Sequence, residues 1–207
     1  MVPEWRGKGL QREIMARLLA APADEEFVFL FANHSVLGFY PRFGFERAVE
    51  TLFCAEHVVA PRADALPTLS LGRAEDRALL ARLAAQAAPV TRRFGARNYG
   101  GILLWYWTNF YEGRIHYCAD DDAIVIAEQA GDRLRICDVL AHAPIDLRRY
   151  LPRIAASPVR RVEFGFTPEA WWPEAQPIAE YRASSLFVRG RRALPRDAFK
   201  FPMLAQT

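Results

Sequence analysis

The 207-residue chain is poor in cysteine and has no long hydrophobic run. Its three thiols are Cys54, Cys118 and Cys137. Because they are odd in number and widely spaced, they argue against a disulfide framework or a zinc site and indicate reduced thiols in a cytoplasm. No apolar stretch approaches the roughly 20 residues of a membrane span, and no signal-peptide layout is present. We therefore expect a cytoplasmic protein without a membrane partner.

The chain also has little excess charge and few histidines. A net charge of +3, with 25% charged and 52% hydrophobic residues, fits a globular protein of one large or two small domains. So small an excess does not indicate nucleic acid as a partner. The histidines His57, His116 and His142 lack metal-ligand spacing, so they are expected to be structural and no metal site is predicted.

The strongest functional signal lies in the first eleven residues. A basic turn, Arg6-Gly7-Lys8-Gly9, leads into an amphipathic helix with Leu10, Ile14 and Leu18 on one face. Glycine lets the backbone turn tightly and leaves N–H groups uncovered, while the helix start and the basic side chains attract negative charge. The turn therefore predicts a pyrophosphate site. A basic surface turn that caps a helix is the alternative.

The turn resembles motif A of the GNAT acyltransferases, Arg/Gln-x-x-Gly-x-Gly/Ala, which binds the pyrophosphate of acetyl-CoA. Arg6 and Gly9 match the motif, whereas Gln11 stands where the family has glycine or alanine. The turn lacks a second glycine and a Lys-Ser/Thr pair at the spacing that a Walker A loop requires. It also lacks the third glycine, three residues on, of a dinucleotide fingerprint. The resemblance implies acetyl-CoA contacts from Val2, Arg6, Gly7, Lys8, Gly9, Leu10 and Gln11.

A second signature follows the apolar run Phe27–Phe31, which is expected to form a buried parallel strand. Residues 33–45 resemble the next GNAT signature, Asn-x6-Tyr followed by Gly-Phe. In that family the CoA arm lies between two splayed strands, the asparagine contacts it, and the tyrosine protonates the departing thiolate. The resemblance implies these roles for Asn33 and Tyr40. The alternatives are a helix cap for Asn33 and a core position for Tyr40.

The resemblance also divides the chain. The resemblance implies that residues 1–60 are the C-terminal half of a GNAT domain, from motif A onward, and we expect the first half of that domain to be absent from this sequence. Residues 61–67 contain two prolines and are typical of a linker. Residues 68–207 are expected to form a second, degenerate GNAT-like domain, which gives an α/β chain with mixed sheets. A different α+β domain is the alternative for this part.

The expected elements of residues 68–207 follow the GNAT order. We predict strands at 68–71, 114–118, 123–128, 133–140, 159–164 and 184–189, helices at 74–88 and 145–156, and a helix or a strand at 101–111. The segment 141–146, after the fourth strand, has no glycine and contains Pro144, which lacks an N–H group. We therefore expect no CoA site in this half.

Aromatic residues gather at 105–111 and at 171–172. Large aromatic side chains most often pack in a core or a domain interface, and that is the expectation for both groups. The alternative is an aromatic wall for an amine-bearing acceptor.

The resemblance implies an N-acetyltransferase that moves an acetyl group from acetyl-CoA to a primary amine of a small molecule or peptide. In that mechanism the amine attacks the thioester carbon, a backbone N–H polarises the carbonyl, and Tyr40 protonates the CoA sulfur. The alternatives are a non-catalytic CoA-binding or protein-interaction module and an inactive fragment of a longer acetyltransferase. A homo-oligomer is left open.

Overall fold

The computed structural model describes residues 4, 8–20, 27–178, 185–190 and 194–206. The chain forms two compact units, and each combines an early and a late segment. The first unit contains Met1–Val49 and Ala183–Leu194, and the second contains Glu50–Arg182 and Pro195–Thr207. These units differ from the expected division at 1–60, 61–67 and 68–207. Both mix helices with strands, which agrees with the α/β class.

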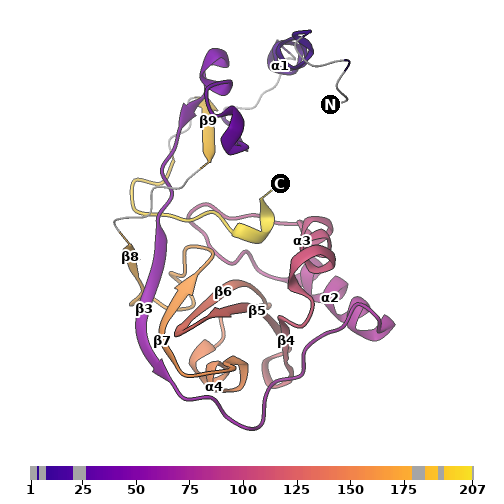
Figure 1. Cartoon of the computed structure of the whole chain (residues 1–207), viewed down its shortest axis with the longest axis vertical. Coiled ribbons are helices and arrows are strands. Elements are labelled where there is room, and N and C mark those ends of the chain that lie inside the picture. The colour runs from indigo at the N-terminus through magenta and orange to yellow at the C-terminus, as the bar shows by residue number, and fades with distance from the viewer. Residues whose placement is uncertain (1–3, 5–7, 21–26, 179–184, 191–193, 207) are drawn as a thin grey trace. The chain divides into compact units, whose positions relative to one another are not determined.

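Within its described residues, the first unit has one α-helix, α1 (Leu10–Ala20), and a three-stranded sheet (Figure 1). Its strands are β1 (Phe27–Phe31), β2 (Glu46–Arg47) and β9 (Leu186–Gly190). Strand β9 lies between the other two and is antiparallel to both. The expectation of a buried parallel strand at 27–31 was therefore wrong: β1 pairs antiparallel with β9 and is only half-buried. An apolar run indicates a strand but not the direction of its partner.

Helix α1 forms where the sequence predicts it, but a different face packs. Leu10, Ile14 and Leu18 are exposed, the last two by more than 60%. Met15 and Leu19 instead pack against a small core. That core consists of Ala32, Phe45 and Phe187. Two apolar stripes lie next to each other on this helix, and spacing alone does not say which of them a sheet will cover.

The second unit contains a six-stranded sheet in the order β4-β5-β6-β7-β3-β8. Its strands are β3 (Leu52–Val59), β4 (Ile115–Cys118), β5 (Ala123–Ala130), β6 (Arg133–Leu140), β7 (Val159–Phe164) and β8 (Gln176–Ile178). Strands β6 and β7 are parallel, and the other neighbours are antiparallel. The sheet is therefore mixed, as expected.

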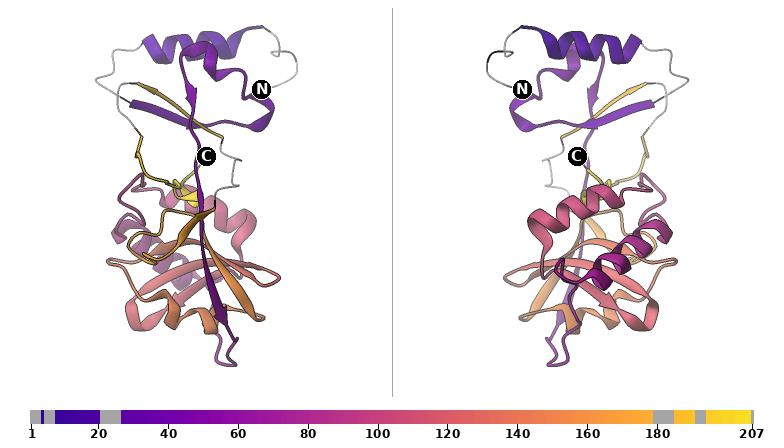
Figure 2. Two further views of the ribbon diagram at one scale, coloured as in Figure 1. Left: turned by 90° about the vertical axis from the view of Figure 1, so that its left-hand side faces the viewer. Right: turned by 90° about the vertical axis from the view of Figure 1, so that its right-hand side faces the viewer.

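Helices cover both faces of this sheet (Figure 2). They are α2 (Ala74–Gln86), α3 (Gly100–Tyr106), which continues as a π-helix over Trp107–Tyr111, and α4 (Leu151–Ile154). Leu83 of α2 and Leu103 of α3 share one core with Ile124 of β5. Leu151 of α4 shares the other core with Val125. Successive residues of β5 therefore serve opposite cores, as the twofold period of a strand requires.

Most predicted elements of the second unit are confirmed, and two differ. The expected strand at 68–71 is reduced to a single bridge between Thr68 and His116. The helix expected at 145–156 is a 3₁₀ turn, Leu147–Arg149, followed by the short α4. Asp146 caps this turn by accepting a hydrogen bond from the Arg148 N–H at 3.1 Å, which starts the helical segment after residue 145.

Two strands, β3 and β9, pair with strands from the opposite side of the expected division at residues 61–67. Strand β3 lies within residues 1–60 yet pairs with β7 and β8, and β9 lies within residues 68–207 yet pairs with β1 and β2. The 61–67 segment is itself attached to the second unit, because the Leu66 N–H donates to the Arg153 carbonyl at 2.9 Å and the Leu66 side chain is buried.

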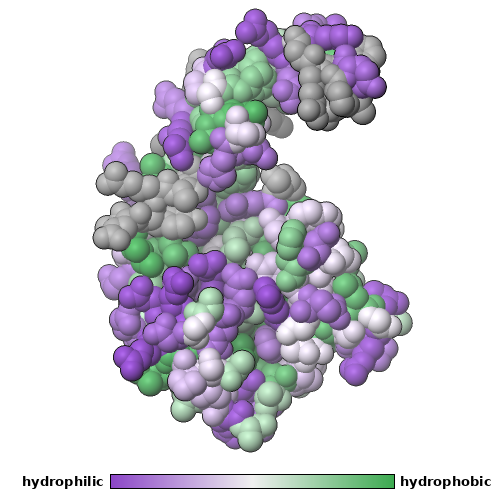
Figure 3. Space-filling view, in the orientation of Figure 1, coloured by the Kyte–Doolittle hydropathy of each residue, from purple (hydrophilic) through white to green (hydrophobic). Residues whose placement is uncertain are grey.

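Hydrophilic residues cover much of the face of the second unit shown in Figure 3, with apolar residues scattered between them. Among the described residues, no helix combines the length and the apolar character that crossing a membrane requires.

Candidate functional site

The turn before α1 is the described part of the predicted anion site. Gly9 has a φ of +73°, which glycine adopts without steric cost, and a Cβ here would have open space around it. The Gly9 carbonyl accepts the first helical hydrogen bond from the Glu13 N–H at 3.1 Å. Residues 8–11 are all exposed. The helix therefore presents its N-terminal N–H groups to solvent, the arrangement that attracts an anion.

Four of the predicted contacts, Lys8, Gly9, Leu10 and Gln11, lie at this turn. Val2, Arg6 and Gly7 fall outside the described residues. The pyrophosphate contact of all seven remains a prediction.

Asn33 caps the short helical turn His34–Val36. Its Oδ1 atom accepts hydrogen bonds from the Ser35 N–H at 2.9 Å and from the Ser35 hydroxyl at 2.8 Å. The capping alternative is therefore observed. These bonds use the carbonyl end of the amide, so a cofactor contact would have to come from the Nδ2 amide group.

Tyr40 begins the 3₁₀ turn Tyr40–Phe43 and is half-buried. Its ring lies beside three phenylalanine rings, with centroid distances of 5.4 Å to Phe39, 6.2 Å to Phe45 and 5.5 Å to Phe187. The ring is therefore packed at the edge of the core of the first unit. A half-buried tyrosine with a packed ring is compatible with a proton donor and with a core position, because its apolar body packs while its hydroxyl end is polar.

All candidate contact residues belong to the first unit. Strand β9 also belongs there, and it brings Phe187 against Tyr40. The sequence places a strand near 184–189 but gives no local signal of its partner, because strand pairing over such a separation depends on the whole chain.

In the second unit, the parallel strands β6 and β7 pair over only part of their length. Parallel pairing of β6 with β7 runs from Arg133–Arg161 to Ile136–Phe164. Beyond Ile136, β6 continues beside β5 alone, after an irregularity at Cys137. The backbone of Gly165 lies at this point and donates to the Ile136 carbonyl at 2.8 Å.

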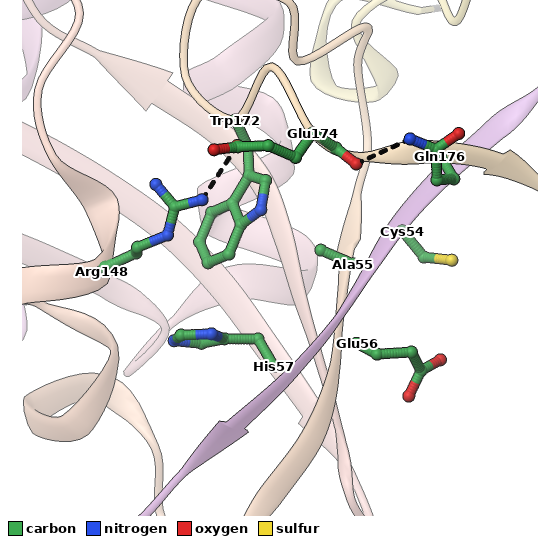
Figure 4. A pocket seen from close by; sticks show the side chains of 8 residues that line it. All are labelled: Cys54, Ala55, Glu56, His57, Arg148, Trp172, Glu174 and Gln176. Carbon is green, nitrogen blue, oxygen red and sulfur yellow. Dashed lines mark hydrogen bonds and ion pairs between the residues drawn. The ribbon is translucent and has the colours of Figure 1, made fainter.

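A separate pocket of about 410 Å³ opens in the second unit (Figure 4). It is lined by Cys54, Ala55, Glu56, His57, Arg148, Trp172, Glu174 and Gln176. The Arg148 guanidinium lies 3.9 Å from the centre of the Trp172 ring and forms a 3.0 Å ion pair with Glu174. His57 meets the same indole edge-on at 5.0 Å. Figure 4 shows His57 on the Trp172 side of β3 and Glu56 on the other side.

The charges in this pocket are largely paired within the protein. Glu174 binds Arg148, and Glu56 binds Arg161 at 2.8 Å. Burial raises the pKa of the Cys54 thiol, which disfavours the nucleophilic thiolate. The neighbouring Trp171 is buried and donates from Nε1 to the Val90 carbonyl at 2.6 Å. The pocket therefore lacks an activated nucleophile, and this tryptophan pair packs as a core element.

Asp138 and His116 are two of the buried titratable groups elsewhere in the second unit. Asp138 accepts hydrogen bonds of 2.8 Å from the Tyr99 hydroxyl and from the Val139 N–H, and burial raises its pKa to about 7. Burial lowers the pKa of His116 to about 4, so the imidazole is neutral. In the described part of the chain, no group of three or more histidine, cysteine, aspartate or glutamate side chains is arranged to hold a metal ion.

No protein-family model matches the chain, and no curated protein sequence matches it. Among solved structures, it is similar to a GCN5-related N-acetyltransferase from Kribbella flavida, with 16% identity, a TM-score of 0.47 and coverage of 92% of this chain and 50% of that one. A probable N-acyltransferase from Enterococcus faecalis shows 14% identity, a TM-score of 0.45 and coverage of 91% and 52%. A GCN5-related N-acetyltransferase from Sphaerobacter thermophilus shows 14% identity, a TM-score of 0.39 and coverage of 99% and 73%. The chain spans about half the length of the first two.

Proposed function

We propose that the first unit binds acetyl-CoA and transfers its acetyl group to a primary amine, as a GNAT-type N-acetyltransferase. The observation that carries the proposal is the exposed N-terminus of α1, opened by Gly9 and preceded by the basic residues Arg6 and Lys8. The pyrophosphate of CoA is an anion of the kind that such a helix start binds.

The reaction is a single displacement at the thioester carbon. The nitrogen of the acceptor amine forms the new C–N bond, and a backbone N–H group donates to the carbonyl oxygen as negative charge develops on it. The C–S bond then breaks, and the sulfur takes its proton from the Tyr40 hydroxyl. Water removes the proton that the amine nitrogen loses, and Tyr40 regains its own proton from solvent. The acceptor belongs to the primary amines, in a small molecule or a peptide.

Calorimetric titration with CoA tests the binding step. Arg6→Ala should weaken binding by roughly 1.5–3 kcal/mol, the contribution of one charge-assisted hydrogen bond, and Gly9→Val should weaken it by disturbing the turn. Arg17→Ala is the matched control, because Arg17 lies on the same helix and is exposed, but sits two turns away and pairs with Glu13 at 2.7 Å. Unchanged affinity in the Arg6→Ala, Gly9→Val double variant would reject the site.

Turnover distinguishes an enzyme from a CoA-binding module. Release of free CoA from acetyl-CoA is measured with one amine from each of four classes: a lysine peptide, an aminoglycoside, a polyamine and an amino acid. Amine-dependent release supports the transferase. CoA binding without release from any of the four would favour the non-catalytic module.

A further inference from the structure

Phe187 has the most constrained position among the neighbours of Tyr40. It is 2% exposed and stands on β9, the central strand of its sheet. Its backbone lies opposite Leu30 of β1 on one side and Arg47 of β2 on the other. A side chain on a strand paired at both edges has a fixed origin and direction. Phe187 is therefore a rigid support within this unit.

The Phe187 ring is inclined to the Tyr40 ring at a different angle from the rings of Phe39 and Phe45. Phe39 and Phe45 meet Tyr40 edge-on, with interplanar angles of 82° and 76°. Phe187 is inclined by only 39° at a centroid distance of 5.5 Å, so it lies more nearly against the face of the tyrosine ring. A ring packed in this way resists rotation about its side-chain bonds, because a turn of the tyrosine would drive it into the phenylalanine.

We propose that Phe187 is a positioning residue for Tyr40, which it acts upon through ring packing and without touching substrate. The proposal rests on the proposed function, in which the Tyr40 hydroxyl gives its proton to the CoA sulfur. A proton donor must lie within about 2.6–3.2 Å of its acceptor, and a displacement of about 1 Å can cost roughly 100-fold in rate. Strand β9, from the late part of the chain, thus sets the activity of a site whose other residues lie in the first 49.

Steady-state kinetics with acetyl-CoA and the best amine of the four classes test this role. Phe187→Leu keeps an apolar side chain but removes the ring. It should lower kcat by about tenfold or more and change the KM for acetyl-CoA by less than about twofold, since the α1 turn is untouched. Leu186→Val is the matched control: it is the preceding residue of β9 and is fully buried. It should change neither constant by more than about twofold.

A double-mutant cycle separates positioning from general damage. If Phe187 acts through the Tyr40 hydroxyl, Phe187→Leu should have no further effect on kcat in a Tyr40→Phe background. The proposal would be overturned if Phe187→Leu lowered kcat by the same factor in the parent and in the Tyr40→Phe background. It would also be overturned if Phe187→Leu and Leu186→Val lowered kcat equally.

A spectroscopic measurement reports on the ring directly. With fluorotyrosine incorporated, the Tyr40 resonance, assigned from its loss in Tyr40→Phe, should shift in Phe187→Leu and not in Leu186→Val. If it does not shift, the positioning contact is wrong even where kcat falls. If it shifts while Tyr40→Phe leaves kcat unchanged, the contact stands, but the proton-donor step of the proposed function fails and the positioning role fails with it.

Discussion

The backbone N–H of Met203 donates to the Gly165 carbonyl at 2.8 Å and ties the C-terminal segment to the residue that follows β7. Nearby, the Thr167 N–H donates to the Lys200 carbonyl at 3.1 Å, and the buried Lys200 ammonium pairs with Glu50 at 3.0 Å. Residues 200–203 therefore lie beside the chain at the point where β6 and β7 cease to pair.

This packing leads to a prediction about stoichiometry. Because the C-terminal segment packs beside the end of β7, and because residues 141–146 lack the glycine turn, the second unit should have no CoA site of its own. Titration calorimetry should give one CoA per chain. Gly9→Val should weaken that single event. Two sites of similar affinity, or a second event whose affinity Gly9→Val leaves unchanged, would contradict the prediction.

A second prediction concerns the tight contact at Gly165. A Cβ at this position would lie 2.4 Å from the Met203 sulfur and 2.8 Å from the Cys137 carbonyl oxygen. Gly165→Ala should lower the free energy of unfolding by about 1–3 kcal/mol, the usual cost of overpacking. Urea denaturation measures the loss. Met203→Ala in the same chain should restore part of it, because the flexible sulfur is removed while the carbonyl remains.

Gly101→Ala is the control for that experiment. Gly101 lies in α3, and a Cβ there would meet no atom within 4 Å. Alanine is also the better helix former, so this variant should be neutral or more stable by up to about 1 kcal/mol. Equal losses at both glycines would show that the contact with Met203 does not matter.

The sequence predicts local structure here better than it predicts pairing. Helix α2 and strands β5 and β6 appear near their expected positions because their periodicity is read from neighbouring residues. The partners of β3 and β9 are not predicted, since β3 pairs with β7, and β9 with β1, across 100 or more positions in the chain. No local pattern records such a pairing.

The candidate site shows the same limit. The turn at Gly9 and the cap at Asn33 are visible in the sequence, because glycine and asparagine have known local preferences. Phe187 is one of 14 phenylalanines, and nothing around it indicates that its ring meets Tyr40. The exposed face of α1 was also missed, since burial depends on where the sheet lies.

A third prediction follows from Asp138. Its pKa is raised from 3.8 to about 7, so between these values the folded state keeps a proton that the unfolded state releases. The stability from this group is therefore present below pH 3.8 and is lost as the pH rises towards 7, by an amount on the order of 4 kcal/mol. Asp138→Asn removes this dependence and can keep both hydrogen bonds. In urea denaturation, its stability relative to the parent should rise from pH 4.5 to 7.5. A difference that stays constant would contradict the prediction.

A fourth prediction has the opposite sign and comes from His116. Its pKa is lowered from 6.5 to about 4, so between these values the unfolded state binds a proton that the folded state does not. Stability from this group is present above pH 6.5 and is lost as the pH falls towards 4, by about 3 kcal/mol. The Nδ1 atom has no hydrogen-bond partner within the described residues, so His116→Leu forfeits no bond there.

The His116→Leu variant should therefore gain stability relative to the parent as the pH falls from 7.5 to 4.5. His142→Gln is the control, because it also removes a histidine but at an exposed position. In the parent protein, the His116 and Asp138 contributions change in opposite directions between pH 4 and 6.5, so the net change of stability with pH is small there. The two single variants should consequently show slopes of opposite sign. If His116→Leu and His142→Gln gave the same profile, His116 would not be held neutral by burial.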